Sequence, residues 1–251
     1  MPALLSVNVN KYALLRNSRG RDVPNLLEAI DTCLAAGAHG ITVHPRLDER
    51  HVRRTDVPAI AAHVRAHHPG VEFNVECQPD PGLVDLVCAV RPAQCTLVPV
   101  RPGEVTSDHG FDLPAETAAL RPIITRLHDA GIRVSIFTDC NAGVIRRAKD
   151  TGTDRVELYT GPYAWAWGTP EQEAETARVW ASAEAATGVG LGVNAGHDLD
   201  RFNLEGMREM PGLLEVSIGH AQICRALEVG TRQSVRELIE ALGYEVGGRT
   251  A

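Results

Sequence analysis

Groups that could transfer protons and hold an anion lie close together within residues 40–51, which read GITVHPRLDERH. Apolar and polar residues alternate up to His44, as in a β-strand, and Pro45 should end that strand because it has no N–H to donate. A histidine at a strand end, followed by fixed cations, suits a proton-transfer group beside a phosphate or carboxylate clamp. The alternative for this stretch alone is a charged surface loop. The residues of such a clamp would be Arg46, Arg50 and His51.

Two later strand ends carry related chemistry. Gly196 permits close approach of a ligand to the backbone, and His197 follows it. Gly219 and His220 lead into a helical stretch that starts at Ala221. A helix N-terminus is a ready anion site because its free N–H groups point outward. We therefore expect a phosphate site where these two loops meet.

Other chemistries have less support. The histidines 44, 51, 197 and 220 could in principle surround a zinc ion, but no close-spaced ligand pair supports a metal site. A loose G-x-G-x-x-A pattern lies inside a strand-like segment instead of between strand and helix, which argues against a dinucleotide site. Lys11 could form a Schiff base, although nothing in its surroundings requires one.

The elements that must position these groups alternate along the chain. Strands are expected at residues 4–10, 40–44, 71–77, 94–100, 133–139, 154–160, 190–195 and 213–219. Helices are expected at 25–36, 56–67, 81–90, 115–130, 142–150, 171–186, 200–210 and 232–242. Eightfold strand–helix alternation predicts an α/β fold, a (β/α)8 TIM barrel, with a doubly wound open sheet as the alternative. We expect one domain over residues 1–246 and a flexible C-terminal tail at 247–251.

The alternation within the strands predicts a polar barrel lumen. If the apolar residues face the helices, asparagines, a histidine and several carboxylates point inward, where buried carboxylates need partners and can acquire shifted pKa values. Glu76 lies at the C-terminal end of its strand, where barrel active sites lie, so we expect a functional role for it. For Glu215 we expect a structural network.

Composition limits the partners. A chain of 251 residues can bury one core of the size usual for α/β barrels. A net charge of −7 without blocks of like charge argues against nucleic acid or an anionic membrane as the main partner. No apolar run approaches the ~20 residues of a membrane span. The six cysteines show no paired spacing and no signal peptide is evident, so we expect reduced thiols in a cytoplasmic protein.

Nine motifs, in order along almost the whole chain, resemble the pyridoxine 5′-phosphate synthase family. They are residues 8–20, 40–46, 48–51, 74–76, 97–99, 104–106, 157–161, 194–197 and 218–220. The resemblance implies a (β/α)8 barrel with extra helices that assembles as a homo-octamer. It also implies a transferase of vitamin B6 biosynthesis that uses no metal or organic cofactor. Such an enzyme condenses 1-deoxy-D-xylulose 5-phosphate with 3-amino-2-oxopropyl phosphate, giving pyridoxine 5′-phosphate, phosphate and water.

The resemblance also implies roles for individual residues. The acid–base groups would be His44, Glu76 and His197, and Glu157 would stabilise charge in the transition states. The amino ketone phosphate would be held by Asn8, Gly219 and His220. The deoxyxylulose phosphate would be held by Arg46, His51 and Thr106, and Arg19 would contribute either from the same chain or across a subunit contact.

Three positions depart from the common family pattern and are still expected to bind substrate. Asn10 and Lys11 stand where many members have Asp-His, and Asp198 stands where a glycine is common. The loop after His44 reads Pro-Arg-Leu-Asp instead of the frequent Leu-Arg-Glu-Asp. These changes are expected to occur together in an Asn-Lys variant of the family.

Two other functions stay open at this point. Asn10 and Lys11 make a paralogue that condenses a different phosphorylated ketone plausible. A non-catalytic pyridoxine-phosphate binding protein is the alternative from another class. A protein that had lost catalytic activity and only bound its ligand should have lost at least one of His44, Glu76 and His197. All three are present.

Overall fold

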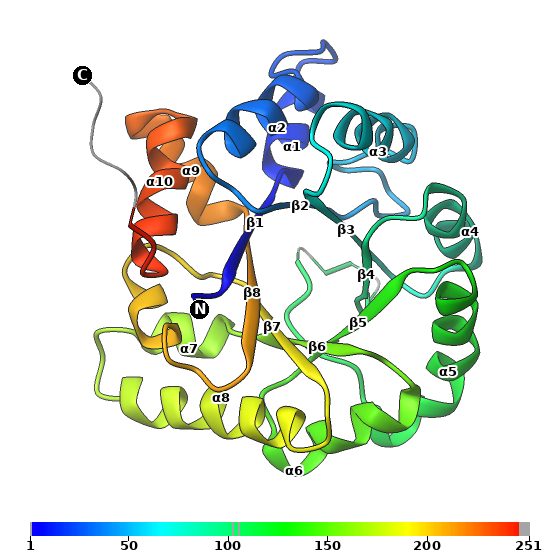
Figure 1. Cartoon of the computed structure of the whole chain (residues 1–251), viewed down its shortest axis with the longest axis vertical. Coiled ribbons are helices and arrows are strands. Elements are labelled where there is room, and N and C mark those ends of the chain that lie inside the picture. Colours follow the sequence, from blue (N-terminus) through cyan, green and yellow to red (C-terminus); the bar gives the residue numbers. More distant parts are fainter. Residues whose placement is uncertain (1, 102, 105, 246–251) are drawn as a thin grey trace.

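Eight parallel strands close into a barrel in the order in which they occur along the chain (Figure 1). The computed structural model describes residues 2–101, 103–104 and 106–245, so the expected tail at 247–251 and the ends of the expected domain lie outside the described residues. The closed sheet confirms the (β/α)8 TIM barrel and excludes the open sheet. The strands are β1 Leu4–Asn8, β2 Gly40–Val43, β3 Glu72–Cys77, β4 Gln94–Leu97, β5 Arg133–Thr138, β6 Arg155–Tyr159, β7 Gly192–Gly196 and β8 Leu213–Ile218.

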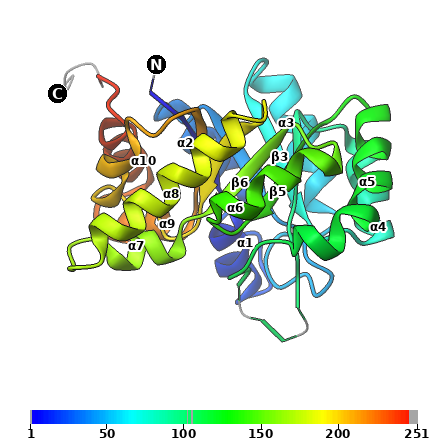
Figure 2. The same cartoon turned by 90° about the horizontal axis from the view of Figure 1, so that it is seen from below.

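Helices surround the barrel on its outside (Figure 1). The α-helices are α1 Asn10–Asn17, α2 Leu26–Ala35, α3 Asp56–His67, α4 Pro81–Val90, α5 Leu113–Asp129, α6 Ala142–Ile145, α7 Gly161–Ala166, α8 Gln172–Thr187, α9 His220–Val229 and α10 Thr231–Ala241. Two 3-10 helices, η1 Arg146–Thr151 and η2 Asn203–Met207, complete the set in the described part of the chain. Figure 2 shows the N-terminal segment at one end of the barrel and α1 at the other.

The apolar residues of the strands face outward and form the core with the helices. Val7 pairs with Ile41 and Ile41 pairs with Phe73 in the register of neighbouring strands, and all three side chains are buried. Local capping fixes where the helices begin. Asn25 accepts hydrogen bonds from the first N–H groups of α2, and Asp80 does the same for α4, which satisfies donors that have no partner inside the helix.

The lumen is polar, as the alternation predicted. The hydroxyls of Ser6 and Thr42 lie 2.7 Å apart across β1 and β2. Asn74 continues the chain of contacts, because it donates to Thr42 at 3.4 Å and accepts from Thr96 at 3.2 Å. Each of these side chains is almost fully buried. The paired hydroxyls and amides therefore offset the cost of burying polar groups in the barrel.

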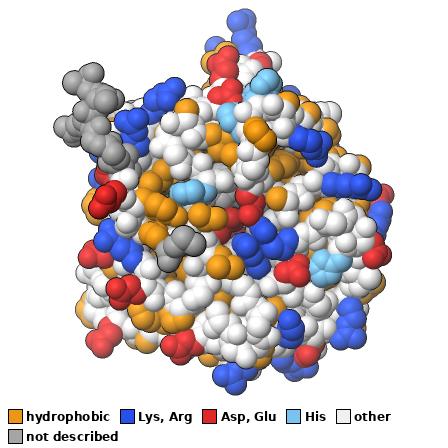
Figure 3. Space-filling model, in the orientation of Figure 1, with side chains coloured by type: hydrophobic (Ala, Val, Ile, Leu, Met, Phe, Trp, Pro, Cys, Tyr) orange, Lys and Arg blue, Asp and Glu red, His pale blue; other side chains and the backbone are white. Residues whose placement is uncertain are grey.

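A charged network closes the end of the barrel at which the strands begin. Figure 3 looks onto this end, and basic and acidic side chains adjoin near its centre. Arg133 donates to Glu72, and Arg155 donates to Asn194 at 3.1 Å. Burial raises the pKa of Glu215 well above its ordinary value, and the nearby Glu72 raises it further. These contacts place Glu215 in a network at this end.

The structure corrects several expected element boundaries. The first strand ends at Asn8 instead of residue 10, because the Asn8 side chain accepts from the Asn10 N–H at 3.0 Å and the chain turns into α1. Neither α1 nor α7 was expected, and β4 ends at Leu97, three residues early. Lys11 therefore lies in the first turn of a helix and not at the end of a strand.

None of the helices in the described part of the chain combines the length and apolar character needed to cross a membrane.

Candidate functional site

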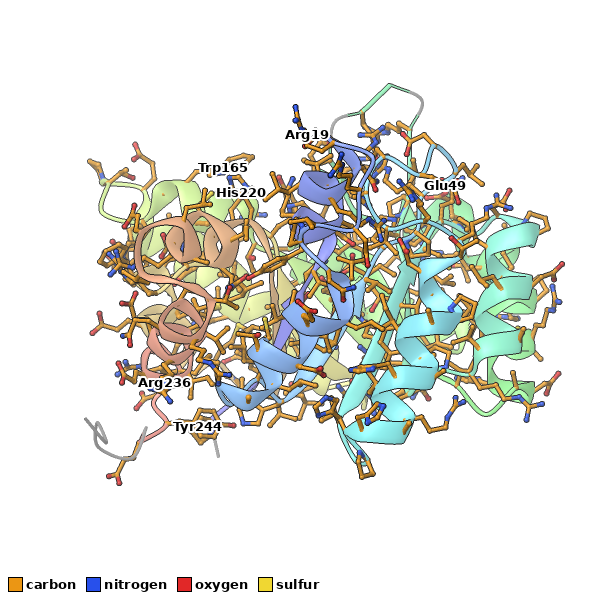
Figure 4. The ribbon with its side chains drawn as sticks, turned by 90° about the horizontal axis from the view of Figure 1, so that it is seen from above. Arg19, Glu49, Trp165, His220, Arg236 and Tyr244 are labelled. Carbon is orange, nitrogen blue, oxygen red and sulfur yellow. The ribbon has the colours of Figure 1, made fainter. Side chains whose placement is uncertain are left out.

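A cavity of about 510 Å³ opens at the C-terminal ends of the strands. The part of its wall that the sequence predicted consists of Asn8, Asn10, Lys11, His44, Arg46, His51, Glu76, Thr106, Glu157, His197, Asp198, Gly219 and His220. Arg19 is the one predicted site residue that does not line the cavity. It lies beyond the end of α1, on the same side of the barrel as Trp165 and His220 and opposite Tyr244 (Figure 4).

His44 and Glu76 form a buried, neutral pair at the base of the cavity. His44 Nδ1 lies 3.5 Å from Glu76 Oε2, and the His44 backbone N–H donates to Asn10 Oδ1 at 2.9 Å. Burial lowers the pKa of His44 well below its ordinary value, with His51 and Arg46 adding to the effect. Burial raises the pKa of Glu76 to about 8. Both shifts favour the uncharged forms, so the two groups form a neutral pair and not a salt bridge, despite their distance.

A second buried carboxyl in the cavity wall is that of Glu157 in β6. Burial raises the pKa of Glu157 well above its ordinary value, and Glu76 raises it further. Gly196 in β7 makes the space for this group, because a Cβ there would collide with Glu157 Oε1. Gly196 was expected to let a ligand approach the backbone closely. The space beside it is instead occupied by the carboxyl of Glu157.

His197 stands on strained backbone above β7. Its φ is 85° and that of Asp198 is 57°, both in the left-handed region that non-glycine residues rarely adopt. The Thr160 hydroxyl supports this turn by donating to the carbonyls of Gly196 and His197 at 2.6 and 2.7 Å. The imidazole contacts the edge of the Tyr159 ring, with centroids 5.3 Å apart. Burial lowers the pKa of His197, so the ring is neutral near pH 7.

Cations gather on one side of the cavity. Arg46 is buried and donates to Glu104 at 3.2 Å. His51 accepts at Nδ1 from the Val52 N–H at 2.9 Å, which leaves Nε2 as its protonated nitrogen. Burial, with Arg46 and Lys11, lowers the pKa of His51 to about 4. A neutral donor beside fixed cations suits a bound anion.

The first helix holds the loop that carries these cations. Arg16 makes two hydrogen bonds of 2.8 Å to Asp56 at the start of α3. Asn17 donates to the carbonyl of His51 at 2.7 Å. The unexpected helix α1 is thus the support of the His44–His51 loop, and its residues Lys11 and Leu14 also line the cavity.

The opposite side of the cavity is formed by β8 and the start of α9. Gly219 precedes the helix, and a Cβ there would lie only 2.8 Å from the carbonyl oxygen of Asn8. His220 is the first residue of α9 and is exposed. The glycine therefore permits a close approach of the two backbones, and the first residues of α9, His220 and Ala221, line the cavity. The anion site at this helix N-terminus stays a prediction.

Some residues of the cavity wall were not predicted. Arg50 was considered only for the clamp, and it donates to the carbonyl of Glu104 at 3.1 Å. Ser217 shares the inward alternation of Glu215, which was the signal that could have identified it. The apolar lining by Leu14, Val98 and Phe137 gave no such signal, because these residues resemble ordinary core residues in the sequence.

The four histidines considered for zinc do not form a ligand cluster. The ring centres of His44 and His51 lie 6.1 Å apart. Within the described ranges, the groups of three or more side chains with ligand atoms close enough for a metal lie elsewhere, one at Asp31, His63 and His68 and another at Glu104, Asp108 and His109.

A closed barrel with a cavity at its strand ends, lined by buried histidine, glutamate and arginine side chains, defines a class of protein, the (β/α)8-barrel enzymes. The model of the family described as pyridoxal phosphate biosynthesis protein PdxJ matches residues 5–243. The chain belongs to this family.

Named relatives and solved structures agree with the assignment. The chain is 50% identical to pyridoxine 5′-phosphate synthase of Xanthomonas axonopodis pv. citri, over 96% of this chain and 97% of the relative. It is 47% identical to the protein of the same name from Albidiferax ferrireducens, over 96% of this chain and 98% of the relative. A crystal structure of tryptophan synthase from M. tuberculosis has a TM-score of 0.66 at 12% identity, covering 97% of this chain and 94% of that one. That likeness shows the fold alone.

Proposed function

We propose that this chain is a pyridoxine 5′-phosphate synthase. It condenses 1-deoxy-D-xylulose 5-phosphate with 3-amino-2-oxopropyl phosphate, giving pyridoxine 5′-phosphate, inorganic phosphate and water. The family and the names of the relatives support this activity. The observation that carries the proposal is the presence of His44, Glu76 and His197 in one cavity, each with a pKa shifted toward its neutral form.

These three groups would share the proton transfers. Imine formation, loss of phosphate, addition of water and aldol-type ring closure each move protons at a different atom, so several titratable groups are needed around one substrate. A pKa of about 8 lets Glu76 accept and return protons near neutral pH. Neutral His44 and His197 are free to accept a proton at the ring nitrogen that carries none. Glu157, kept protonated by burial, can donate a hydrogen bond to developing negative charge.

Two phosphates would occupy the two sides of the cavity. Arg46, His51 and Thr106 would hold the deoxyxylulose phosphate on the cationic side, with Asn10 and Lys11 beside them. Asn8, Gly219 and His220 would hold the amino ketone phosphate at the start of α9. Asp198, fixed by a 2.9 Å hydrogen bond from Trp165, would orient the second substrate near His197.

The activity is tested by incubating purified protein with both substrates. Growth of the pyridinol absorption and release of one phosphate per ring are expected, with neither signal when either substrate is omitted. Binding of both substrates without ring formation would indicate a binding protein. Ring formation only with another phosphorylated ketone would indicate the paralogue.

We also propose a cytoplasmic homo-octamer, in which Arg19 of one subunit reaches the substrate site of another. The placement of Arg19 outside the cavity of its own chain, on the same side of the barrel, supports the second point. Light scattering is expected to give the mass of eight 27.1 kDa chains. A monomeric protein that is fully active would rule out this arrangement.

Lys11→Ala is expected to raise the KM for the deoxyxylulose substrate by about 10–150-fold. This factor corresponds to the loss of one charge-assisted hydrogen bond, which is worth roughly 1.5–3 kcal/mol. Lys11 lines the cavity and, in the part of the chain that the structure describes, has no ion-pair partner, so its loss should hardly change the melting temperature. Steady-state kinetics with each substrate varied in turn measures the effect, and the KM for the amino ketone should stay nearly constant.

Lys149→Ala is the matched control, because that lysine lies in η1, outside the cavity wall, and should leave both constants unchanged. If Lys11→Ala instead lowers stability by several degrees and shifts both constants together, Lys11 is a structural residue.

A further inference from the structure

A cluster of imidazole and carboxylate groups joins α2 to α3, far from the cavity. His63 Nε2 lies 2.6 Å from Asp31 Oδ1, and His68 Nε2 lies 2.7 Å from the same oxygen. One potential ligand atom from each of the three residues lies within 4.8 Å of the other two. In a barrel the helices run antiparallel to the strands, so the end of α3 lies where the strands begin, at the end opposite the cavity. Figure 1 shows α2 and α3 as neighbours.

The surroundings favour a cation at this point. Two imidazole nitrogens, His63 Nε2 and His68 Nε2, approach the same oxygen of Asp31. Imidazole nitrogen and carboxylate oxygen are the ligand types that zinc prefers, so potential ligands of the right kind lie together at this point.

A further donor is at hand. His67 follows His63 by one helical turn on α3, and their ring centres lie 4.7 Å apart. His67 is exposed, so its ring can turn toward the same point without disturbing the core. Water can supply the fourth ligand where His67 does not.

We propose that Asp31, His63 and His68 bind a divalent transition-metal ion such as Zn²⁺, with His67 as an additional ligand. Imidazole nitrogen and carboxylate oxygen are suitable ligands for zinc, at about 2.0–2.2 Å. Ligand atoms of a tetrahedral ion at those bond lengths stand about 3.3 Å apart, so the two nitrogen–oxygen separations must each widen by about 0.7 Å. The three side chains are only partly buried and can make this adjustment. Metal binding displaces the proton from each Nε2: an imidazolium releases that proton to solvent, and a neutral ring carries its proton on Nδ1 instead.

The ion would hold together two helices that are adjacent in the barrel. It would stabilise the fold without taking part in the reaction, because the site lies at the other end of the molecule from the catalytic groups. This role is independent of the proposed synthase activity.

The test uses protein without a histidine tag, stripped of metal with a chelator. Calorimetric titration with ZnCl₂ is expected to show a site that is lost in the His63→Gln/His68→Gln double variant. At a free Zn²⁺ concentration about 100 times the Kd, the melting temperature should rise by about 5–10 °C over that of the metal-free natural chain. The double variant should show no such rise and should keep full turnover.

His128→Gln is the matched control, because His128 also pairs with a single carboxylate, Asp154, at 2.8 Å but belongs to no group of three potential ligands among the described residues. It should retain the zinc site. Asp31→Asn gives a second measurement if the double variant is poorly folded, and Co²⁺ gives an independent one through its visible absorption. Equal zinc stoichiometry in the natural chain and the double variant, or no binding by the natural chain, would overturn the proposal.

Discussion

Glu76→Gln is expected to lower turnover by ~10²–10⁴-fold while both substrates still bind, because the amide keeps the shape of the carboxyl but cannot accept a proton. The carboxyl lies 3.5 Å from His44 and accepts a hydrogen bond from Asn8 at 3.4 Å, and glutamine can keep the second contact through its oxygen. Single-turnover kinetics with measured substrate affinities separates the two effects. A variant with near-natural turnover would remove Glu76 from the acid–base groups.

The same substitution has a predicted effect on stability. Burial raises the pKa of Glu76 in the folded chain from its ordinary 4.5 to about 8. The stability that depends on its protonated form is fully present below pH 4.5 and is lost as the pH rises through 8. Glutamine does not ionise, so Glu76→Gln should raise the melting temperature at pH 8 by roughly 9–17 °C relative to the natural chain. The gain should shrink as the pH is lowered, and thermal scans across that range measure it.

Glu215→Gln is the matched control for activity. Glu215 is another lumen carboxyl with a pKa raised by burial, but it belongs to the network at the opposite end of the barrel and does not line the cavity. Its replacement should leave turnover within about twofold, since it touches no substrate. If Glu76→Gln and Glu215→Gln lowered turnover equally, the loss would come from damage to the barrel by the replacement of any buried carboxyl.

Much of the barrel was predictable because its signals are local. Each strand carries its own period-2 alternation, and the resulting polar lumen follows from which side of the strand faces the helices. His44, Glu76 and His197 all stand at or just after the C-terminal ends of strands, and the barrel geometry alone brings such positions together. The strand ends therefore predicted the position of the cavity.

Features that depend on contacts between distant segments were not predictable. Asn8 ends the first strand through a side-chain hydrogen bond to Asn10, and nothing in the alternation of residues 4–10 indicates that turn. The neutral state of the His44–Glu76 pair depends on burial by the whole barrel. Similarly, Asp31 and His63 are separated by 32 residues and meet only because α2 and α3 are neighbours. Their proximity has no sequence pattern of the kind that close-spaced metal ligands show.

His197→Asn is expected to lower turnover by ~10²–10⁴-fold and to remove one ionisation from the acidic side of the pH–rate profile. Asparagine tolerates left-handed backbone better than most residues, so the turn at φ 85° should persist and the loss should report on the imidazole. Burial lowers the pKa of His197 below 6.5, so the natural enzyme should lose activity as the pH falls through that lowered value and the ring becomes protonated.

His220→Asn is the control. This exposed histidine at the start of α9 should change the KM for the amino ketone and leave the acidic side of the pH–rate profile unchanged. The decisive measurement is kcat/KM from pH 4 to pH 9 for the three proteins. If His197→Asn lowers activity by the same factor at every pH, the imidazole only supports the Tyr159 and Phe137 rings that it contacts, and the proton transfer assigned to it belongs to another group.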